Sequence, residues 1–223
     1  MKRLKSFIFS NSNMLTLASF IYNLNNIFRV NCSPHNKIQY SKAFLRKTRI
    51  KINKDNNSIL IMTGSFLYNC SIAIYGKNNK VIIGKECRLK DVQFHIEDDN
   101  NFIFIGNYTT IAGHTHLACI EGTKITIGED CMFSKDIVFR TGDSHSIIDE
   151  NRNRINPSKD ILIGNHVWIG NKVIVTKGVN INDNSIIGTG SLVTNSFNDS
   201  NIVIAGVPAR KIKSGINWLR ARI

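Results

Sequence analysis

The feature that most constrains the fold is a six-residue spacing of aliphatic side chains in the C-terminal half of the chain. Side chains two positions apart on a strand face the same side, whereas a step of six does not return to the same face of an α-helix. The spacing therefore predicts short strands, each with two inward side chains and a following turn. The repeated position holds Ile163, Ile169, Val175, Ile181, Ile187 and Val193, with apolar or small residues two positions before each.

A longer period is superimposed on this spacing in the first half of the chain. An Ile-Gly step recurs at a constant interval, at Ile83, Ile105 and Ile127, and Ile61 precedes the first by the same interval. Three six-residue strands would close one triangular coil, and the longer interval exceeds such a coil by four positions, which an outward loop would fill. Stacked coils bury a continuous column of Ile and Val, which predicts a solenoid.

Cysteine usage argues against a disulfide framework and against a zinc site. The chain has five cysteines, an odd number, and no CxxC pair. Cys87 and Cys131 fall on small inward positions of the repeat, so we interpret them as core residues. The pattern favours a reducing cytoplasm and predicts no bound metal.

The positive charge is concentrated in an N-terminal arm. Residues 1–54 contain eleven Lys or Arg and no acidic residue, whereas the remaining chain carries 18 basic and 16 acidic residues. Such an arm suits anionic lipid, an acidic polysaccharide or nucleic acid, or is simply a solvated basic face. We expect no nucleic-acid partner, because the chain has no zinc-finger spacing and no basic helix leading into a heptad zipper.

Within this arm, Met14, Leu17, Ile21, Leu24 and Phe28 recur at helical spacing. The segment is too short, and too rich in Asn, to span a bilayer. Two interpretations stay open: a helix packed on the domain or a neighbouring subunit, and an anchor at a membrane surface. The basic residues before it are followed by no clear cleavage site, which argues against a signal peptide.

The repeat breaks at Asp143 and His145. Continued from the pair Ile137/Phe139, the spacing would place an acid and an imidazole at inward positions. Burying both without partners is unfavourable, so either the coil opens here or the pair faces a cleft. The polar residues that follow, 146–160, read as an excursion from the coil.

The stretch from Ile161 to Lys213 closely resembles the C-terminal half of the hexapeptide-repeat acetyltransferase family. Upstream, GDSHSIID at 142–149 followed by RIN at 154–156 resembles the subgroup that acts on bacterial surface polysaccharides, where sialic acid and capsule O-acetyltransferases belong. The resemblance covers roughly residues 59–218. The motifs of the first stretch are HVWIG (166–170), KGV (177–179), IIGTGSLV (186–193) and AGVPARKI (205–212).

This resemblance implies an all-β fold, a left-handed parallel β-helix. The hand comes from the family, since ordinary parallel crossovers are right-handed. We expect a basic, partly helical arm over residues 1–50, a β-helix acetyltransferase domain over 51–213 and a C-terminal cap or tail over 214–223. The arm and the segment 215–223 are expected to cover the open ends of the solenoid.

The family places its catalytic histidine on the motif that contains His145 here. An unperturbed histidine has a pKa of about 6.5, which suits proton transfer near neutral pH. We expect His145 to deprotonate a sugar hydroxyl as it attacks the thioester, and then to protonate the coenzyme A thiolate. For Asp143 the roles left open are orienting the imidazole, binding the acceptor and capping a turn. The alternative for His145 is a structural role in the loop.

The resemblance also implies a site for acetyl-coenzyme A. Trp168 lies between inward positions and therefore points outward, toward a ligand or a neighbouring subunit; related enzymes use this tryptophan at the acetyl and pantetheine site. We expect the two basic residues of AGVPARKI to contact phosphate, with plain solvated charge as the alternative. The expected coenzyme A contacts are Trp168, Gly188, Ser191, Ala205, Gly206, Arg210 and Lys211.

Other histidines carry weaker signals. His114 and His116 flank one residue, as metal ligands can, but no third ligand is evident and a turn or subunit contact is the favoured interpretation. His166, in HVWIG, is interpreted as structural or as part of the acceptor side.

These observations predict an acetyl-coenzyme A-dependent O-acetyltransferase of a capsule-type or O-antigen-type polysaccharide or its precursor. The family implies a homotrimer with active sites between adjacent prisms. An acidic or lipid-linked glycan is the expected acceptor, and the cytoplasm the expected location, with peripheral contact at the inner membrane as an open alternative. The alternatives are N-acetylation of a nucleotide-linked amino sugar and a non-catalytic β-helix scaffold.

Overall fold

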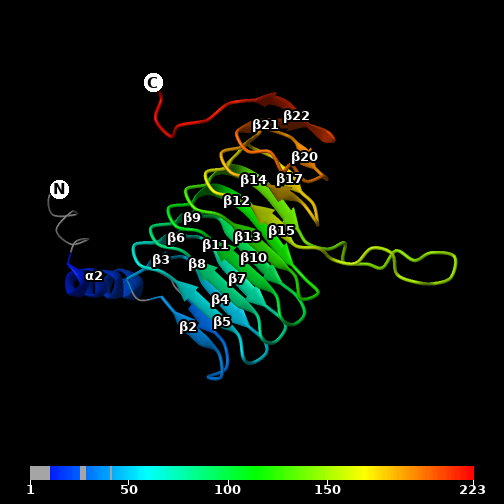
Figure 1. Ribbon diagram of the computed structural model, residues 1–223. Coiled ribbons are helices and arrows are strands. Elements are labelled where there is room, and N and C mark those ends of the chain that lie inside the picture. Colours follow the sequence, from blue (N-terminus) through cyan, green and yellow to red (C-terminus); the bar gives the residue numbers. More distant parts are fainter. Residues whose placement is uncertain (1–10, 26–28, 41) are drawn as a thin grey trace.

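The computed structural model describes residues 11–25, 29–40 and 42–223. From Arg29 onward the chain winds into stacked coils of parallel strands, with three faces to each coil (Figure 1). The first face carries β2 (Lys37–Gln39), β5 (Ser58–Ile61), β8 (Lys80–Ile83), β11 (Phe102–Ile105), β13 (Lys124–Ile127), β15 (Ile161–Ile163) and β18 (Asn180–Ile181).

Two further sets of parallel strands make the other faces. The second face carries β3 (Phe44–Arg46), β6 (Phe66–Tyr68), β9 (Arg88–Lys90), the starts of β12 (Thr110–Cys119) and β14 (Met132–Arg140), β16 (Trp168–Ile169), β19 (Ile186–Ile187) and β21 (Ile202–Gly206). The third face carries β1 (Arg29–Asn31), β4 (Arg49–Ile52), β7 (Ser71–Ile74), β10 (Val92–Ile96), the ends of β12 and β14, β17 (Ile174–Val175) and β20 (Leu192–Val193).

Strand register confirms the periods in the sequence. Ile103 pairs with Ile125 at the longer interval, and Ile163 pairs with Ile181 at the interval of three six-residue strands. The inward positions named for the repeat are buried, which confirms a core of stacked aliphatic side chains. Cys87 and Cys131 belong to this core, and burial raises the pKa of their thiols to about 11 and about 12. Both thiols therefore stay protonated and fill space.

A ladder of buried asparagines closes the corner where each early coil returns from the third face to the first. We call this the return corner. Asn79 N donates to Asn57 Oδ1, and Asn101 N donates to Asn79 Oδ1, both at 2.8 Å. Thr123 N continues the ladder to Asn101 Oδ1 at 3.1 Å. These amides supply the backbone hydrogen bonds that a buried turn requires.

The helix α2 (Ser12–Asn25) closes the free edge of β3. The side chain of Asn23 acts as a short piece of strand: its Nδ2 donates to Ala43 O at 3.0 Å, and Leu45 N donates to its Oδ1 at 2.8 Å. An uncovered edge would leave these backbone groups without partners. Strand pairing already begins at Arg29, so the expected domain boundary at residue 50 falls within the first coil.

The face of α2 that was expected to be apolar points away from the solenoid. Leu17, Ile21 and Leu24 expose 59%, 49% and 69% of their surface, whereas Leu15 and Ser19 on the opposite side are buried. The helix therefore packs on its own domain through a different face from the one expected. Phe28, the last residue of the expected stripe, and the basic residues at 2, 3 and 5 lie outside the described residues. In the described part, no helix has the length and hydropathy needed to cross a bilayer.

The C-terminal end corrects one expectation. β22 (Ala209–Ser214) turns back antiparallel on β21 and covers its edge. The segment after it does not cover the open end but runs down the side of the solenoid, because the Arg220 guanidinium donates to Thr110 Oγ1 at 3.0 Å and to Cys131 O at 2.9 Å.

Candidate active site

At the return corner after β14 the chain leaves the solenoid as a long loop, residues 141–160 (Figure 1). The loop folds on itself through an antiparallel bridge between Ile148 and Arg154. It contains Asp143 and His145, and both side chains are exposed. The coil therefore opens at the break in the repeat, which was one of the two expected alternatives.

Asn156 fixes the backbone on either side of His145. This asparagine is 7% exposed, although it lies in the loop. Its Nδ2 donates to His145 O and to Asp143 Oδ2, both at 2.8 Å, and its Oδ1 accepts from Ile147 N at 2.7 Å. A buried amide with this many partners holds the chain in one arrangement. His145 is thus presented to solvent from a defined main chain.

Asp143 forms an ion pair with Lys177, in the turn after β17. The hydrogen bond from Lys177, with that from Asn156, holds the pKa of Asp143 below its ordinary value. Lys177 Nζ also donates to Asn156 O at 3.1 Å. The carboxylate is therefore tied to the loop framework, and Asp143 acts on His145 only through Asn156 in this arrangement.

An arginine ties the outer part of the loop to the previous coil. Arg154 Nη2 donates to Glu121 Oε1 at 2.7 Å, and its Nε donates to Asn156 Oδ1 at 3.3 Å. The hydrogen bond from Arg154 lowers the pKa of Glu121, with a smaller contribution from Ser158. The carboxylate therefore stays ionised and keeps the loop docked at neutral pH.

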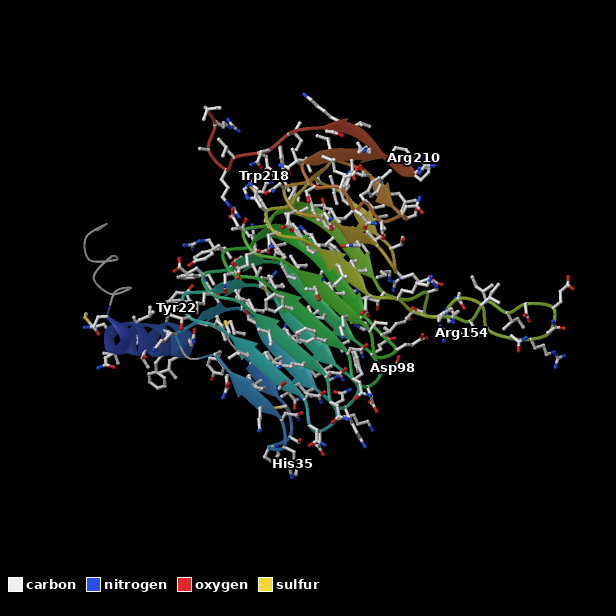
Figure 2. All side chains as sticks on the ribbon, in the orientation of Figure 1. Tyr22, His35, Asp98, Arg154, Arg210 and Trp218 are labelled. Carbon is white, nitrogen blue, oxygen red and sulfur yellow. The ribbon has the colours of Figure 1, made fainter. Side chains whose placement is uncertain are left out.

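Trp168 lies on the second face, away from the loop. It points outward, as expected, and is 39% exposed. Its ring centroid is 6.2 Å from that of Trp218, in the C-terminal segment. In Figure 2, Trp218 and Arg154 mark opposite sides of the solenoid. One chain therefore does not bring Trp168 and His145 to the same place.

The other residues expected to bind coenzyme A gather at the last coils. Ser191 Oγ donates to Gly188 O at 2.6 Å and accepts from Gly206 N at 3.2 Å. A Cβ on Gly188 would lie 2.9 Å from that of Ala205, so only glycine fits between these coils. Arg210 pairs with Ala205 across β21 and β22.

The two expected phosphate contacts differ in their surroundings. Lys211 forms an ion pair with Asp199 at 2.7 Å, whereas the Arg210 side chain is exposed and projects near the last coils in Figure 2. Arg210 is therefore the more available of the two for an anionic ligand, because the Lys211 ammonium already has a carboxylate partner.

His166 has a structural role. Its Nδ1 lies 2.8 Å from Asp130 Oδ2, its Nε2 lies 3.0 Å from Trp218 O, and its ring stacks on that of Trp218 with centroids 4.0 Å apart. Although partial burial opposes the shift, hydrogen bonds from Arg220 and His166 lower the pKa of Asp130. This cluster attaches the C-terminal segment to the second face.

His114 and His116 have different neighbours. His114 lies 3.8 Å from Asp136, and the His116 ring lies 5.9 Å from that of His95. Among the residues the structure describes, no three His, Cys, Asp or Glu side chains gather as a metal site would require.

Sequence reasoning did not assign the residues that hold the loop: Glu121, Arg154, Asn156 and Lys177. A signal was present, because Arg154 and Asn156 lie in RIN and Lys177 begins KGV, both motifs of the resemblance. Their joint role depends on a loop that returns to the coil, and spacing in the sequence does not indicate that return.

Comparison with known proteins agrees with this architecture, although no protein-family profile matches the chain. A polysialic acid O-acetyltransferase of Neisseria meningitidis is 34% identical over 144 residues, which is 55% of this chain and 67% of that protein. One of Escherichia coli O1:K1 / APEC is 35% identical over 119 residues, 53% of this chain, and the match spans 38% of its length.

Among solved structures, the polysialic acid O-acetyltransferase OatWY superposes with a TM-score of 0.84 at 31% identity, over 89% of this chain and 93% of that one. The polySia-specific acetyltransferase NeuO gives a TM-score of 0.75, also at 31% identity, over 87% of this chain and 85% of that one. The chain therefore belongs to the hexapeptide-repeat acetyltransferase family, within its polysaccharide O-acetyltransferase subgroup, and is an acyltransferase.

Proposed function

We propose that this chain transfers the acetyl group of acetyl-coenzyme A to a hydroxyl of a bacterial surface polysaccharide or its precursor, with His145 as the general base. The names of the relatives support a glycan acceptor. The observation that carries the proposal is an exposed imidazole on a loop whose backbone Asn156 fixes on both sides.

The proposed chemistry is a direct transfer. His145 takes the hydroxyl proton as the sugar oxygen forms a bond to the thioester carbonyl carbon, and a backbone N–H stabilises the oxygen that gains charge. The C–S bond then breaks, and the imidazolium returns the proton to the departing thiolate. The enzyme ends as it began. Asp143 and Lys177 are positioning residues here, because they hold Asn156 and Asn156 holds the backbone at His145.

The last coils suit coenzyme A. The backbone is open at Gly190, where an added Cβ would meet no atom within 4 Å, whereas a Cβ on Gly206 would lie 3.3 Å from Pro208 O. Ser191 and Ala205 lie beside these glycines, and Arg210 supplies a guanidinium that matches phosphate geometry. We propose that Lys211 joins Arg210 at the phosphates after leaving Asp199.

We infer a homotrimer in which the site is completed between two copies. Trp168 and His145 lie on different sides of one solenoid, so both can reach one thioester only if they come from neighbouring chains. Mixed trimers test this: His145→Ala and Trp168→Ala proteins, each impaired alone, should regain activity when co-expressed. Hybrids as inactive as the parents would contradict the shared site.

We further propose that the enzyme works in the cytoplasm, with a peripheral contact at the inner membrane surface. The exposed stripe Leu17, Phe20, Ile21 and Leu24 on α2 supports this contact, as does the absence of acidic residues before Asp55. Co-sedimentation with anionic vesicles should fall strongly in Leu17→Gln/Leu24→Gln. Equal sedimentation of both proteins would favour a neighbouring subunit as the partner of the stripe.

The acceptor class is tested by offering acetyl-coenzyme A and a panel of glycans, with transfer followed by mass spectrometry. The panel contains polysialic acid, other capsular polysaccharides, O-antigen, lipid-linked precursors and nucleotide-linked amino sugars. We expect O-acetyl esters on a polymer or its precursor. Transfer confined to the amino-sugar nucleotides would overturn the proposal in favour of N-acetylation, and binding of acetyl-coenzyme A without any transfer would favour a scaffold.

A further inference from the structure

An open hollow of about 700 Å³ lies on the same corner of the solenoid as the His145 loop, but nearer the N-terminus. Figure 2 shows one of its lining residues, Asp98, on the same side of the molecule as Arg154. The hollow is formed by three successive return-corner turns and by His95 on β10. The turns contribute Lys54, then Tyr75 and Lys77, then Glu97, Asp98 and Asp99.

The rings of Tyr75 and His95 line the hollow, and His116 lies behind His95 on the next strand. Tyr75 follows the inward residue Ile74 and is 39% exposed. Its ring centroid lies 5.2 Å from that of His95, and the His95 ring lies 5.9 Å from that of His116 on the next strand. Burial, His95 and Arg140 lower the pKa of His116, so this imidazole is neutral at neutral pH. Flat rings beside polar groups are a typical lining for an amphipathic ligand such as a sugar.

The polar groups of the hollow leave two cations available. Glu97 Oε1 is 2.8 Å from His95 Nε2, and Asp99 Oδ1 accepts from Lys77 N at 2.7 Å. For the ammonium groups of Lys54 and Lys77, by contrast, no ion pair occurs within the described residues. The hollow therefore offers two unpaired hydrogen-bond donors beside carboxylates that already have partners.

Hydrogen bonds connect the hollow to the loop. Asp98 Oδ2 accepts from Glu121 N at 3.1 Å, and the Glu121 carboxylate holds Arg154. Arg154 in turn bonds Asn156, which holds the backbone at His145. Three steps between neighbouring strands, β7 to β10 to β12 to β14, separate the Tyr75 coil from the base of the loop, which amounts to about 14 Å along the stack.

We propose that this hollow binds a sugar ring of the acceptor chain more than one unit away from the ring that receives the acetyl group. The inference rests on the proposed transfer to a glycan, and it adds a substrate class: a polymer or long oligosaccharide. One ring stacks on Tyr75, and the ammonium groups of Lys54 and Lys77 donate to its hydroxyl or carboxylate oxygens. Short acceptors reach the loop but not the hollow.

The test uses the full chain, saturating acetyl-coenzyme A, and the polysaccharide acetylated in the panel together with fragments of it graded in length. The unmodified protein should show kcat/KM at least tenfold higher for long fragments than for short ones. In Tyr75→Ala this length ratio should fall about tenfold, a change that corresponds to about 1.4 kcal/mol. Lys77→Ala, a second exposed position, should lower the ratio in the same direction.

Tyr108→Ala is the matched control, because Tyr108 is also an exposed tyrosine but is absent from the hollow; its length ratio should equal that of the unmodified protein. Calorimetric titration of long fragments without acetyl-coenzyme A should give weaker binding for Tyr75→Ala. Transfer to glycans with no length preference, or with a ratio unaffected by Tyr75→Ala and Lys77→Ala, would overturn the hollow's role alone. Transfer to no glycan would overturn the proposed function as well.

Discussion

At the return corner the chain must pass from the third face to the first with its backbone hydrogen bonds satisfied. The early coils and the coil after β14 do this in different ways. In the early coils, Asn57, Asn79 and Asn101 are buried and hydrogen-bond one another from coil to coil, so the turn stays inside the stack. After β14 the ladder has ended at Thr123 and Thr141, whose hydroxyls lie 2.7 Å apart. The next buried asparagine, Asn156, bonds within the loop instead.

This difference separates stability from function along one edge of the molecule. A stacked amide satisfies the coil above and the coil below, so it contributes to the whole solenoid. The side-chain amide of Asn156 bonds groups of its own loop, and the result is an imidazole held outside the core. Buried asparagines should therefore give different phenotypes when substituted at the two places.

The largest expected effect comes from removing the imidazole. His145→Ala should lower kcat by about 10²–10⁴, the usual contribution of a general base, with an unchanged thermal unfolding midpoint, because the side chain is exposed. His114→Ala, which removes an exposed histidine on β12, is the control and should retain activity. Near-normal turnover by a folded His145→Ala protein would refute the mechanism.

The second-largest loss of activity is expected for Asn156→Ala. Without the amide, the backbone at His145 loses its fixed position, and misplacement of about 1 Å can lower rates by about 10². The loss should appear mainly in kcat, and the pH–rate profile should keep its shape because the base is still present. A profile shifted along the pH axis would instead indicate that Asn156 tunes His145 directly.

Asn101→Ala tests the other half of the comparison. It removes the Oδ1 that accepts from Thr123 N at 3.1 Å and leaves this buried N–H only its longer bond to Ile120 O at 3.3 Å. Losing a buried hydrogen-bond partner costs about 1–3 kcal/mol. Chemical denaturation should register this loss, while activity per folded molecule should remain near that of the unmodified protein. If Asn101→Ala impaired kcat as strongly as Asn156→Ala, the proposed division between the two regions would be wrong.

The smallest effect is expected for Lys177→Ala. The pKa of Asp143 is lowered in the folded protein, so the ion pair stabilises above the unfolded pKa and its contribution is lost as pH falls through the folded one. Without Lys177 the pKa of Asp143 should rise toward its ordinary value of 3.8. NMR titration of the carboxyl carbon measures this shift, and Lys172→Ala, a lysine in a neighbouring turn, should leave it unchanged.

Much of the fold could be predicted because one residue spacing encodes it locally. Inward Ile and Val side chains recur at fixed positions of each six-residue repeat, so the period alone predicts the buried column. The break at Asp143 and His145 marks where the coil opens. The asparagine ladder was not predicted, because single asparagines in turns look alike whether they face solvent or each other. The constant interval between Asn57, Asn79 and Asn101, equal to that of the Ile-Gly steps, was the available signal.

The sequence by itself determined the solenoid, its coil lengths, its core and the position along the chain where an imidazole leaves the repeat, since all of these follow from residue spacings that recur regularly along the chain. Tertiary structure decided which face of α2 is buried, where the segment after Gly215 runs and which residues hold the loop. It also placed Trp168 and His145 on different sides of one chain. These outcomes depend on contacts between segments 20 to 110 residues apart, for example Asn23 with Ala43 and Arg220 with Thr110.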